Sequence, residues 1–306
     1  MNPIEVLTVG HSCYDLSFYV EKDPKSDEKI FALDLIICGG GPGANAAVVV
    51  RRLGGTSAFC GYVGRDDFGE KILEEFKREG VDTRLVQRGN APTPVACCLV
   101  KPDGQRAVIN YKKSTPQLSG EGINTTLLKP KVILFDGHEL AASQEFLKLA
   151  KKEKILTVLD AGSFHEGTRV LAPEVDYVVA SEKFVLQKTS SNNSYTAFEQ
   201  VSKEYKNFVL TLGPKGLLWK CQGQEGKMKS LPIKAVDTNG AGDAFHGAFS
   251  LGLARGFDWK ELLFFSTITA TLSCTRKGAR TSFPTKEEVE SELKKIEAST
   301  LFDENH

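Results

Sequence analysis

The stretch Asp237-Thr238-Asn239-Gly240-Ala241-Gly242-Asp243-Ala244-Phe245 joins a glycine-rich turn directly to a helical run over residues 244–254. The N-terminus of a helix exposes unpaired N–H groups and the positive end of the helix dipole, so it attracts anions. Glycines at positions 240 and 242 let an anion approach the backbone closely. The four N–H groups from Gly240 to Asp243 are therefore predicted to bind an anion.

Asp243 needs a separate explanation, because a carboxylate in such a turn would repel a phosphate. A base that takes a proton from an attacking hydroxyl would explain it. The same residue is also compatible with a plain helix cap, with the glycines forming only a turn. The turn alone leaves both interpretations open.

A second glycine-rich segment lies upstream, where residues 39–47 read GGGPGANAA and lead into the apolar run 48–53. No Gly-Lys-Ser/Thr follows, so the segment is not a Walker A loop, and it lacks the dinucleotide-binding fingerprint. Asn45 could present its amide to a ligand. Tight packing of a helix on a sheet, with Asn45 as a cap, explains the segment as well.

Outward from these two segments, short apolar runs alternate with helical patterns such as residues 68–78 and 141–152. Runs that are apolar on both faces are typical of parallel strands covered by helices. Repeated β-α units of this kind predict an α/β fold with a doubly wound, mainly parallel sheet. The predicted strands are residues 4–9, 57–63, 131–135, 155–159, 175–180 and 208–212.

Two regions, residues 17–38 and 94–111, interrupt the alternation with strand-like runs and no helix. In the second, runs 95–100 and 106–111 flank an Asp103-Gly104 turn, which is a good hairpin signal. We expect these strands to form one small sheet that projects from the main one as a lid. Residues 1–306 are predicted to form a single domain that carries this insertion.

The composition excludes several classes of protein. Lys+Arg and Asp+Glu both number 39 in 306 residues, so the basic excess typical of nucleic-acid-binding proteins is missing. Every apolar run is far shorter than a membrane span, and the N-terminus lacks a basic signal region. Seven cysteines without a CxxC pair favour reduced thiols, and hence a cytoplasmic protein.

Taken together and in this order, the two glycine-rich motifs resemble the ribokinase-like (PfkB) carbohydrate kinase family, over nearly the whole chain. The resemblance implies a parallel sheet flanked by helices, with a small β-lid over a sugar. It also implies transfer of the γ-phosphate of ATP to a sugar hydroxyl, with Mg²⁺ and, in ribokinase-type members, K⁺. Family lids often pair across a two-fold axis, so it further implies a homodimer.

The resemblance assigns roles to matching residues. Asp243 matches the catalytic base, and the anion hole is matched by Gly240, Ala241 and Gly242. Family sugar contacts correspond to Asp15, Gly40, Gly41 and Asn45. The nucleotide segment corresponds to Thr211, Gly213 and Gly216. Positions around a monovalent cation correspond to Asp237, Asn239, Ser273, Arg276, Gly278 and Ser282.

The chain also departs from the family pattern. Many members carry Asn-x-x-Glu after a central strand, but here residues 181–184 read SEKF. Glu182 is the nearest substitute for the acid that acts with magnesium and the nucleotide, and it is equally an ordinary acid at a helix start. Residues 135–139, FDGHE, resemble the ketohexokinase-like and sulfofructose-kinase-like branches, which favours a ketose substrate. Asp136 and His138 would then touch the substrate or line the sheet edge.

Two other functions remain open at this point. A nucleoside kinase uses the same core, and an aromatic residue of the lid that stacks on a base would favour it; Phe18, Tyr19 and Phe31 are candidates. A non-catalytic sugar- or nucleotide-binding protein is the other alternative. An intact Asp243 beside a glycine turn argues against the latter.

Overall fold

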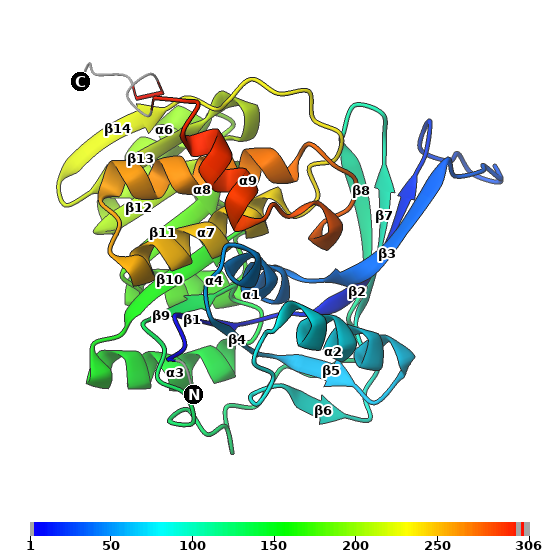
Figure 1. Cartoon of the computed structure of the whole chain (residues 1–306), viewed down its shortest axis with the longest axis horizontal. Helices are drawn as coiled ribbons and strands as arrows, with labels where there is room; N and C mark the ends of the chain where they lie inside the picture. The colour runs from blue at the N-terminus through cyan, green and yellow to red at the C-terminus, as the bar shows by residue number, and fades with distance from the viewer. Residues whose placement is uncertain (1–2, 298–300, 303–306) are drawn as a thin grey trace.

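The computed structural model describes residues 3–297 and 301–302. Its centre is an eight-stranded sheet in the order β14-β13-β12-β11-β10-β9-β1-β4 (Figure 1). The six strands from β12 to β4 are parallel to one another. At one edge, β13 pairs antiparallel with β12, and β14 pairs antiparallel with β13. These strands are β1 (Val6–Val9), β4 (Ser57–Cys60), β9 (Val132–Phe135), β10 (Leu156–Ala161), β11 (Tyr177–Ser181), β12 (Asn207–Thr211), β13 (Leu217–Cys221) and β14 (Gln224–Met228).

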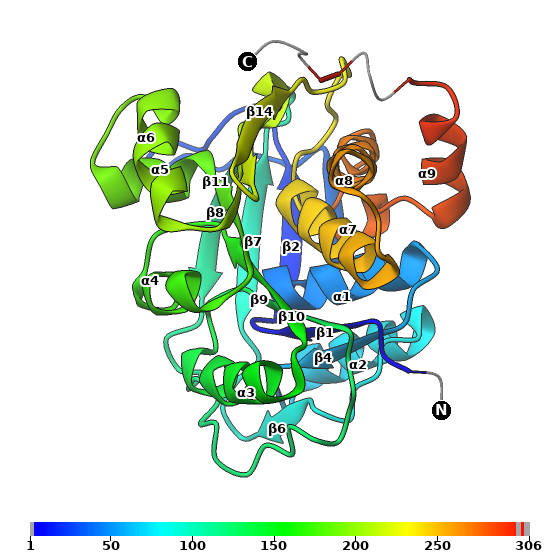
Figure 2. The same cartoon turned by 90° about the vertical axis from the view of Figure 1, so that its left-hand side faces the viewer.

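Helices cover both faces of this sheet, as Figure 2 shows edge-on. One layer consists of α1 (Pro42–Arg52), α2 (Asp67–Glu79), α7 (Ala241–Arg255), α8 (Trp259–Ser273) and α9 (Lys286–Leu293). The other consists of α3 (Leu140–Glu153), α4 (Glu166–Leu171), α5 (Glu182–Thr189) and α6 (Ser194–Val201). Successive strand residues point to opposite faces, so Val6 joins the first core and Leu7 the second. The predicted doubly wound α/β fold is confirmed.

One predicted strand is wrong in its extent. The run 57–63 divides at Gly61 into β4 and β5 (Tyr62–Gly64), and β5 pairs with β6 (Gln87–Gly89) in a separate two-stranded sheet. A Cβ at position 61 would lie 2.2 Å from the Phe59 ring and 2.5 Å from the Gly10 carbonyl oxygen. Only glycine fits there, and the chain changes sheets at that point.

The lid is a four-stranded sheet in the order β3-β2-β7-β8, on the right in Figure 1. Its hairpin, β7 (Val95–Val100) and β8 (Arg106–Tyr111), has the predicted bounds, and Gly104 in the turn has φ +77°. Strands β2 (Cys13–Tyr19) and β3 (Asp34–Gly40) extend beyond the predicted region. Asp15, for which the family resemblance implies a sugar contact, therefore lies within lid strand β2. Assignment of residues 1–306 to one domain stays a prediction.

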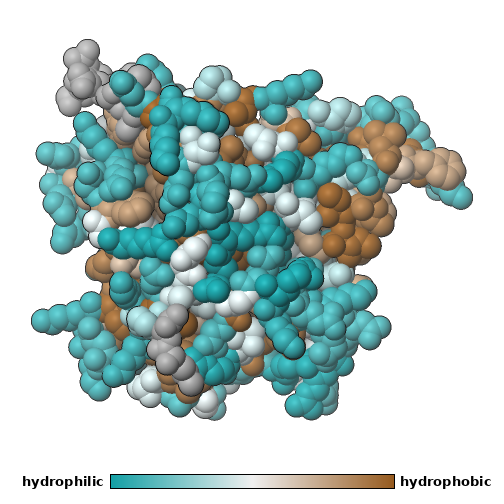
Figure 3. All heavy atoms as spheres, in the orientation of Figure 1, coloured by the Kyte–Doolittle hydropathy of each residue, from teal (hydrophilic) through white to brown (hydrophobic). Residues whose placement is uncertain are grey.

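The two faces of the lid differ in chemistry. The strand registers place Asp15, Tyr19 and Arg106 on the face toward the main sheet. The opposite face carries Ile37 and Ile109, whose side chains are 46% and 67% exposed. Apolar surface gathers over the lid on the right of Figure 3. The outer face of the lid is thus an uncovered apolar surface. Such a patch differs from the single exposed apolar residues that are normal on a protein surface.

No helix among residues 3–297 and 301–302 has the length and apolarity needed to cross a membrane.

Helix α7 is tied to the sheet beneath it by a buried histidine. The His246 ring nitrogens contact the carbonyl oxygens of Gly242 at 2.6 Å and Val179 at 3.1 Å. Nδ1 also lies 3.4 Å from a carboxylate oxygen of Asp160 in β10. Burial raises the pKa of Asp160 to about 7, with a further contribution from the nearby Asp243 carboxylate, while His246 opposes the shift.

The raised pKa of Asp160 predicts a pH dependence of stability. Its pKa is about 7 in the fold and about 3.9 in an unfolded chain, so its contribution to stability is full below the lower value and is lost as the pH rises to the upper one. Asp160→Asn removes this loss. Relative to wild type, the variant's unfolding midpoint should therefore be higher at about pH 8 than at about pH 5. Thermal unfolding at the two pH values checks this; a pH-independent difference would contradict it.

Candidate active site

Asp243 and Asn45, 198 positions apart in sequence, meet at the N-termini of α7 and α1. The Asn45 side-chain amide donates to the Asp243 carboxylate at 2.7 Å. Burial raises the pKa of Asp243, and the Asn45 hydrogen bond opposes that shift. An aspartate whose pKa is raised while one oxygen is held by an amide is an oriented proton acceptor.

Arg280 fixes the orientation of Asn45. Its Nε donates to the Asn45 Oδ1 at 2.9 Å, and its other nitrogens reach Glu75 at 2.9 Å and the Gly40 carbonyl oxygen at 3.2 Å. The arginine is only 3% exposed. Sequence reasoning missed both Arg280 and Glu75. The one signal in the sequence was the position of Arg280 directly after the apolar Ala279. The structure shows that Ala279 is buried.

Asp15 lies at the same junction, on lid strand β2. It is buried, and the hydrogen bond that its carboxylate accepts comes from the Cys13 thiol at 2.9 Å. Burial raises the pKa of Asp15, and the neighbouring Asp243 charge adds to the shift. A Cβ at position 40 would lie 2.1 Å from its Oδ2, so glycine there makes room for the carboxylate. A thiol is a weak donor, which leaves Asp15 able to accept stronger hydrogen bonds from a ligand.

The glycine turn before α7 has the backbone of an anion site. Gly240 adopts φ +78° at the N-cap, a conformation that favours glycine. Ala241 N donates to the Thr238 carbonyl oxygen at 3.3 Å, which is a long bond. Gly242 is exposed, and a Cβ there would meet nothing closer than His246 Cε1 at 4.0 Å. The turn therefore presents open space beside the first-turn amides of Gly242 and Asp243.

Asp136 accepts hydrogen bonds from three backbone N–H groups, two of which lie in distant segments of the chain. Its Oδ2 accepts from the N–H groups of His11 at 2.7 Å and Gly43 at 3.0 Å, and its Oδ1 accepts from His138 at 2.9 Å. The side chain is 4% exposed. With three partners inside the protein, this carboxylate is suited to holding the site together.

The His138 ring lies between two other imidazoles. Its centroid is 5.1 Å from that of His165, nearly parallel to it, and 5.4 Å from that of His11. Nε2 of His11 is buried without a hydrogen-bond partner. Burial lowers the pKa of His11 well below its usual range, with Lys112 contributing. His138 is thus part of an imidazole cluster beside Asp136.

The residues matched to the nucleotide segment lie at the ends of β11 and β12. Thr211 pairs with Ser181, directly before Glu182 at the start of α5. Glu182 accepts from the Ser194 hydroxyl, and the Lys215 ammonium lies 3.5 Å away. Gly213 faces open space, whereas a Cβ at Gly216 would lie 2.0 Å from a backbone oxygen of β14. Thr211, Gly213 and Glu182 share one sheet edge, and Gly216 serves chain packing.

Of the residues matched to a monovalent cation, Asp237 and Gly278 are in direct contact. Gly278 N donates to Asp237 Oδ2 at 2.9 Å, and Asn239 N donates to Oδ1 at 2.8 Å. Arg276 donates to the Ser282 carbonyl oxygen at 3.1 Å. Ser273 is the last residue of α8. The Asp237 carboxylate already accepts hydrogen bonds on both oxygens.

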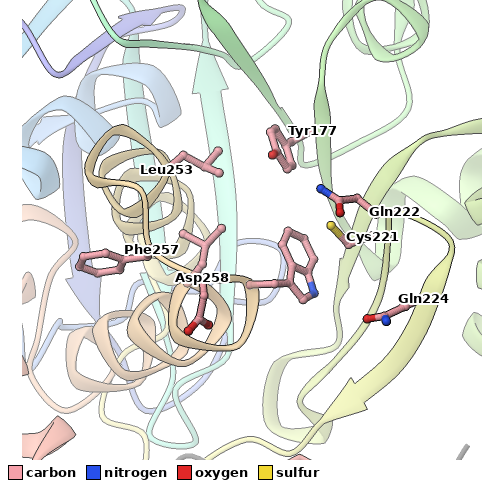
Figure 4. A pocket seen from close by; sticks show the side chains of 9 residues that line it. Tyr177, Cys221, Gln222, Gln224, Leu253, Phe257 and Asp258 are labelled. Atoms are coloured by element: carbon pink, nitrogen blue, oxygen red, sulfur yellow. The ribbon is translucent and has the colours of Figure 1, made fainter.

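A cavity of about 380 Å³ lies elsewhere, as Figure 4 shows. Tyr177 at the start of β11 lines it, together with Cys221, which pairs with the first residue of β12. Trp259, at the start of α8, also lines it. These are the amino ends of the parallel strands. The cavity is therefore at the opposite end of the sheet from the glycine turns and is not part of this site.

Comparisons with known proteins agree with the geometry. A family model described as pfkB family carbohydrate kinase matches residues 4–286. A ribokinase of Lactococcus lactis subsp. lactis is 27% identical over 303 residues, covering 96% of this chain and 98% of the relative. The solved ribokinase of Thermotoga maritima superposes with a TM-score of 0.83 at 28% identity, covering 95% and 99% of the two chains. The solved ribokinase of Arabidopsis thaliana, complexed with ribose and ATP, gives 0.80 at 25% identity, with 96% and 99% covered. The chain belongs to the pfkB family of carbohydrate kinases.

Proposed function

We propose that this protein transfers the γ-phosphate of ATP to a hydroxyl of a sugar, with Asp243 as the general base. The observation that carries the proposal is the contact between Asp243 and Asn45, 2.7 Å long, beside a glycine turn with room for an anion. Arabidopsis ribokinase, solved with ribose and ATP, has the same fold. A chain that only bound its ligands would not need an oriented base at the anion turn.

Asp243 would accept the hydroxyl proton as the oxygen attacks phosphorus. Burial raises the pKa of Asp243. A carboxylate whose pKa lies closer to neutral is a better proton acceptor. The amides of the turn from Gly240 to Asp243 would stabilise the charge on the equatorial oxygens. Because these donors are backbone groups at a helix start, they are oriented before the substrate binds.

The sugar would be bound by Asp15 and Asn45, with Gly40 and Gly41 letting it approach the backbone. Asp15 has only a thiol as its internal donor, so sugar hydroxyls can satisfy its carboxylate. Asp136 is a positioning residue in this scheme, since its oxygens hold three backbone amides. His138 lies two positions after Asp136 and belongs to the imidazole cluster. It is the candidate for contact with the far end of the sugar.

ATP would lie along the ends of β11 and β12, against Thr211 and Gly213, with Gly216 shaping the loop and Glu182 as the nearest acid. Among the described residues there is no group of three or more His, Cys, Asp or Glu side chains that would hold a metal. That fits Mg²⁺ carried mainly by the phosphates and water. The ion supplies charge neutralisation on the phosphates.

We propose that the acceptor is a free sugar. The sequence of residues 135–139 favours a ketose. The lid aromatics support a sugar over a nucleoside: Phe18 lies on the face away from Asp15, Phe31 is 81% exposed, and the Tyr19 hydroxyl is bonded to Asp237. None of these three is therefore arranged to stack on a base. A coupled assay of ADP formation against ribose, deoxyribose, fructose, other ketoses and nucleosides tests this. Turnover of nucleosides alone would reject it.

Asp243→Asn should lower kcat by about 10²–10⁴-fold, because the amide keeps the size of the side chain but cannot take the proton. ATP binding and the unfolding midpoint should change little. Steady-state kinetics with the best acceptor, alongside ATP titration by calorimetry, measure both. A variant that keeps more than about a tenth of wild-type kcat would rule out the base assignment.

Gly242→Val should abolish phosphoryl transfer while leaving the fold intact. A Cβ at this position meets no atom within 3.9 Å, since the nearest is His246 Cε1 at 4.0 Å, yet the side chain would fill the space that the phosphate must enter. Activity and thermal unfolding measured on the same sample check both halves. Wild-type turnover by the valine variant would show that the turn is not the anion site.

The exposed apolar face of the lid favours a homodimer, formed when two lids cover each other. Light scattering should give about twice the mass of one chain at micromolar concentration. Ile109→Asp, on that face, should give the mass of one chain. Tyr195→Asp on α6, which changes a 54% exposed side chain far from the lid, is the matched control and should stay dimeric. Wild-type monomers would refute the dimer and leave the kinase proposal unaffected.

A further inference from the structure

Asp237 is a fully buried carboxylate in the anion turn, and the lid supplies one of its hydrogen-bond donors. The Tyr19 hydroxyl of β2 donates to Asp237 Oδ2 at 2.6 Å, although the two residues are 218 positions apart. The single N–H of Gly278 is shared between the same Oδ2 at 2.9 Å and the Tyr19 hydroxyl oxygen at 2.6 Å, and Asn239 N donates to Oδ1 at 2.8 Å. The carboxylate thus has two donors of its own inside the protein, Tyr19 and Asn239, and a share of the Gly278 proton.

The Tyr19 hydroxyl is held as a neutral donor. Its oxygen accepts from Gly278 N at 2.6 Å, which leaves its single proton for Asp237. Burial raises the pKa of Tyr19, and the Asp237 carboxylate raises it further. The Lys277 ammonium lies over the Tyr19 ring, 4.6 Å from its centroid, and also pairs with Asp34 of β3 at 2.6 Å. The phenol is therefore fixed from both sides.

A second contact ties the lid to the same turn. The Arg106 guanidinium of β8 lies 3.1 Å from the Thr238 hydroxyl, which itself donates to the Gly104 carbonyl oxygen at 3.0 Å. Asp237 and Thr238 are the residues that lead into Gly240. The lid is thus bonded to the backbone segment that sets the position of the anion-binding amides.

We propose that the Tyr19 hydroxyl takes the place of a monovalent cation at Asp237, and that it positions the anion turn without potassium. A buried carboxylate needs partners, and a carboxylate offers about four lone-pair sites. Tyr19 and Asn239 each use one, and the Gly278 N–H is shared between Oδ2 and the Tyr19 oxygen. A cation bound at Oδ2 would have to displace a hydroxyl that is itself anchored by Gly278. The arrangement at Asp237 does not fit a resident cation.

The first test uses the wild-type protein. Thermal unfolding in KCl and in tetramethylammonium chloride, at equal ionic strength, should give the same midpoint. Resident K⁺ at about tenfold above its dissociation constant would instead raise the midpoint by about 2 °C in KCl alone. The activity arm rests on the proposed function: kcat/KM with the best acceptor should differ by less than about twofold between the two salts. A potassium-specific rise in either quantity overturns the proposal.

Two variants test the hydroxyl itself. Tyr19→Phe removes the donor but keeps the ring, so kcat should fall and K⁺ should not restore it. Wild-type kcat in this variant would overturn the positioning role. Tyr19→Leu leaves room beside Asp237, so it should gain a response to K⁺, about tenfold in kcat/KM and about 2 °C in midpoint. A folded leucine variant that ignores K⁺ contradicts the substitution of hydroxyl for cation.

Tyr62→Phe is the matched control. Its hydroxyl donates to the Ala91 carbonyl oxygen at 2.7 Å in the two-stranded sheet region, away from the anion turn. Losing that bond should lower the midpoint and produce no potassium response. If no acceptor is phosphorylated by wild type, the proposed function fails, while the midpoints in the two salts still decide the inference on Tyr19.

Discussion

The site depends on one buried carboxylate that joins three segments of chain. Asp136 at the end of β9 accepts the N–H groups of His11, Gly43 and its own neighbour His138. Those segments lead to β2, to α1 and to α3, respectively. A Cβ at position 10 would lie 2.1 Å from Asp136 Oδ2, so the glycine is what allows the carboxylate to reach both amides. Since hydrogen bonds to a charged acceptor are stronger than neutral ones, this junction fixes where β2 and α1 begin.

The side chains of the candidate site lie only a few residues along the chain from that junction. Asn45 is two residues beyond Gly43, and Asp15 is four beyond His11, so both are placed near Asp243. The result is a group of acidic side chains that lie close together. Burial raises the pKa of both Asp15 and Asp243, and neighbouring carboxylates add to the shift. Arg280, paired with Glu75 at 2.9 Å, lies within this group and opposes the shift on Asp15. Its charge thus partly offsets the burial of the Asp15 carboxylate.

Much of this fold could be predicted from local pattern. Apolar runs located the six parallel strands of the main sheet but not the antiparallel β13 and β14, and the Asp103-Gly104 turn located the lid hairpin, because both signals act over a few residues. The division of the run 57–63 at Gly61 was missed, since it depends on crowding against Gly10, which is distant in sequence. The motif residues were found as separate groups. That they meet at one sheet edge follows from the strand order, not from any one motif.

Sequence reasoning missed Arg280 and named Tyr19 only as a candidate for stacking on a base, and the contacts that both make share one property. Arg280 contacts Asn45 across 235 positions, and Tyr19 contacts Asp237 across 218. No periodicity or spacing indicates a polar pair at such separations. Their roles emerge only when two elements are packed. Both join β2 and α1, which carry the proposed sugar contacts, to the C-terminal half that carries the glycine turn. Because the lid is hydrogen-bonded directly to the segment that leads into the glycine turn, the proposed function implies that enclosure of the sugar and binding of the phosphate are coupled.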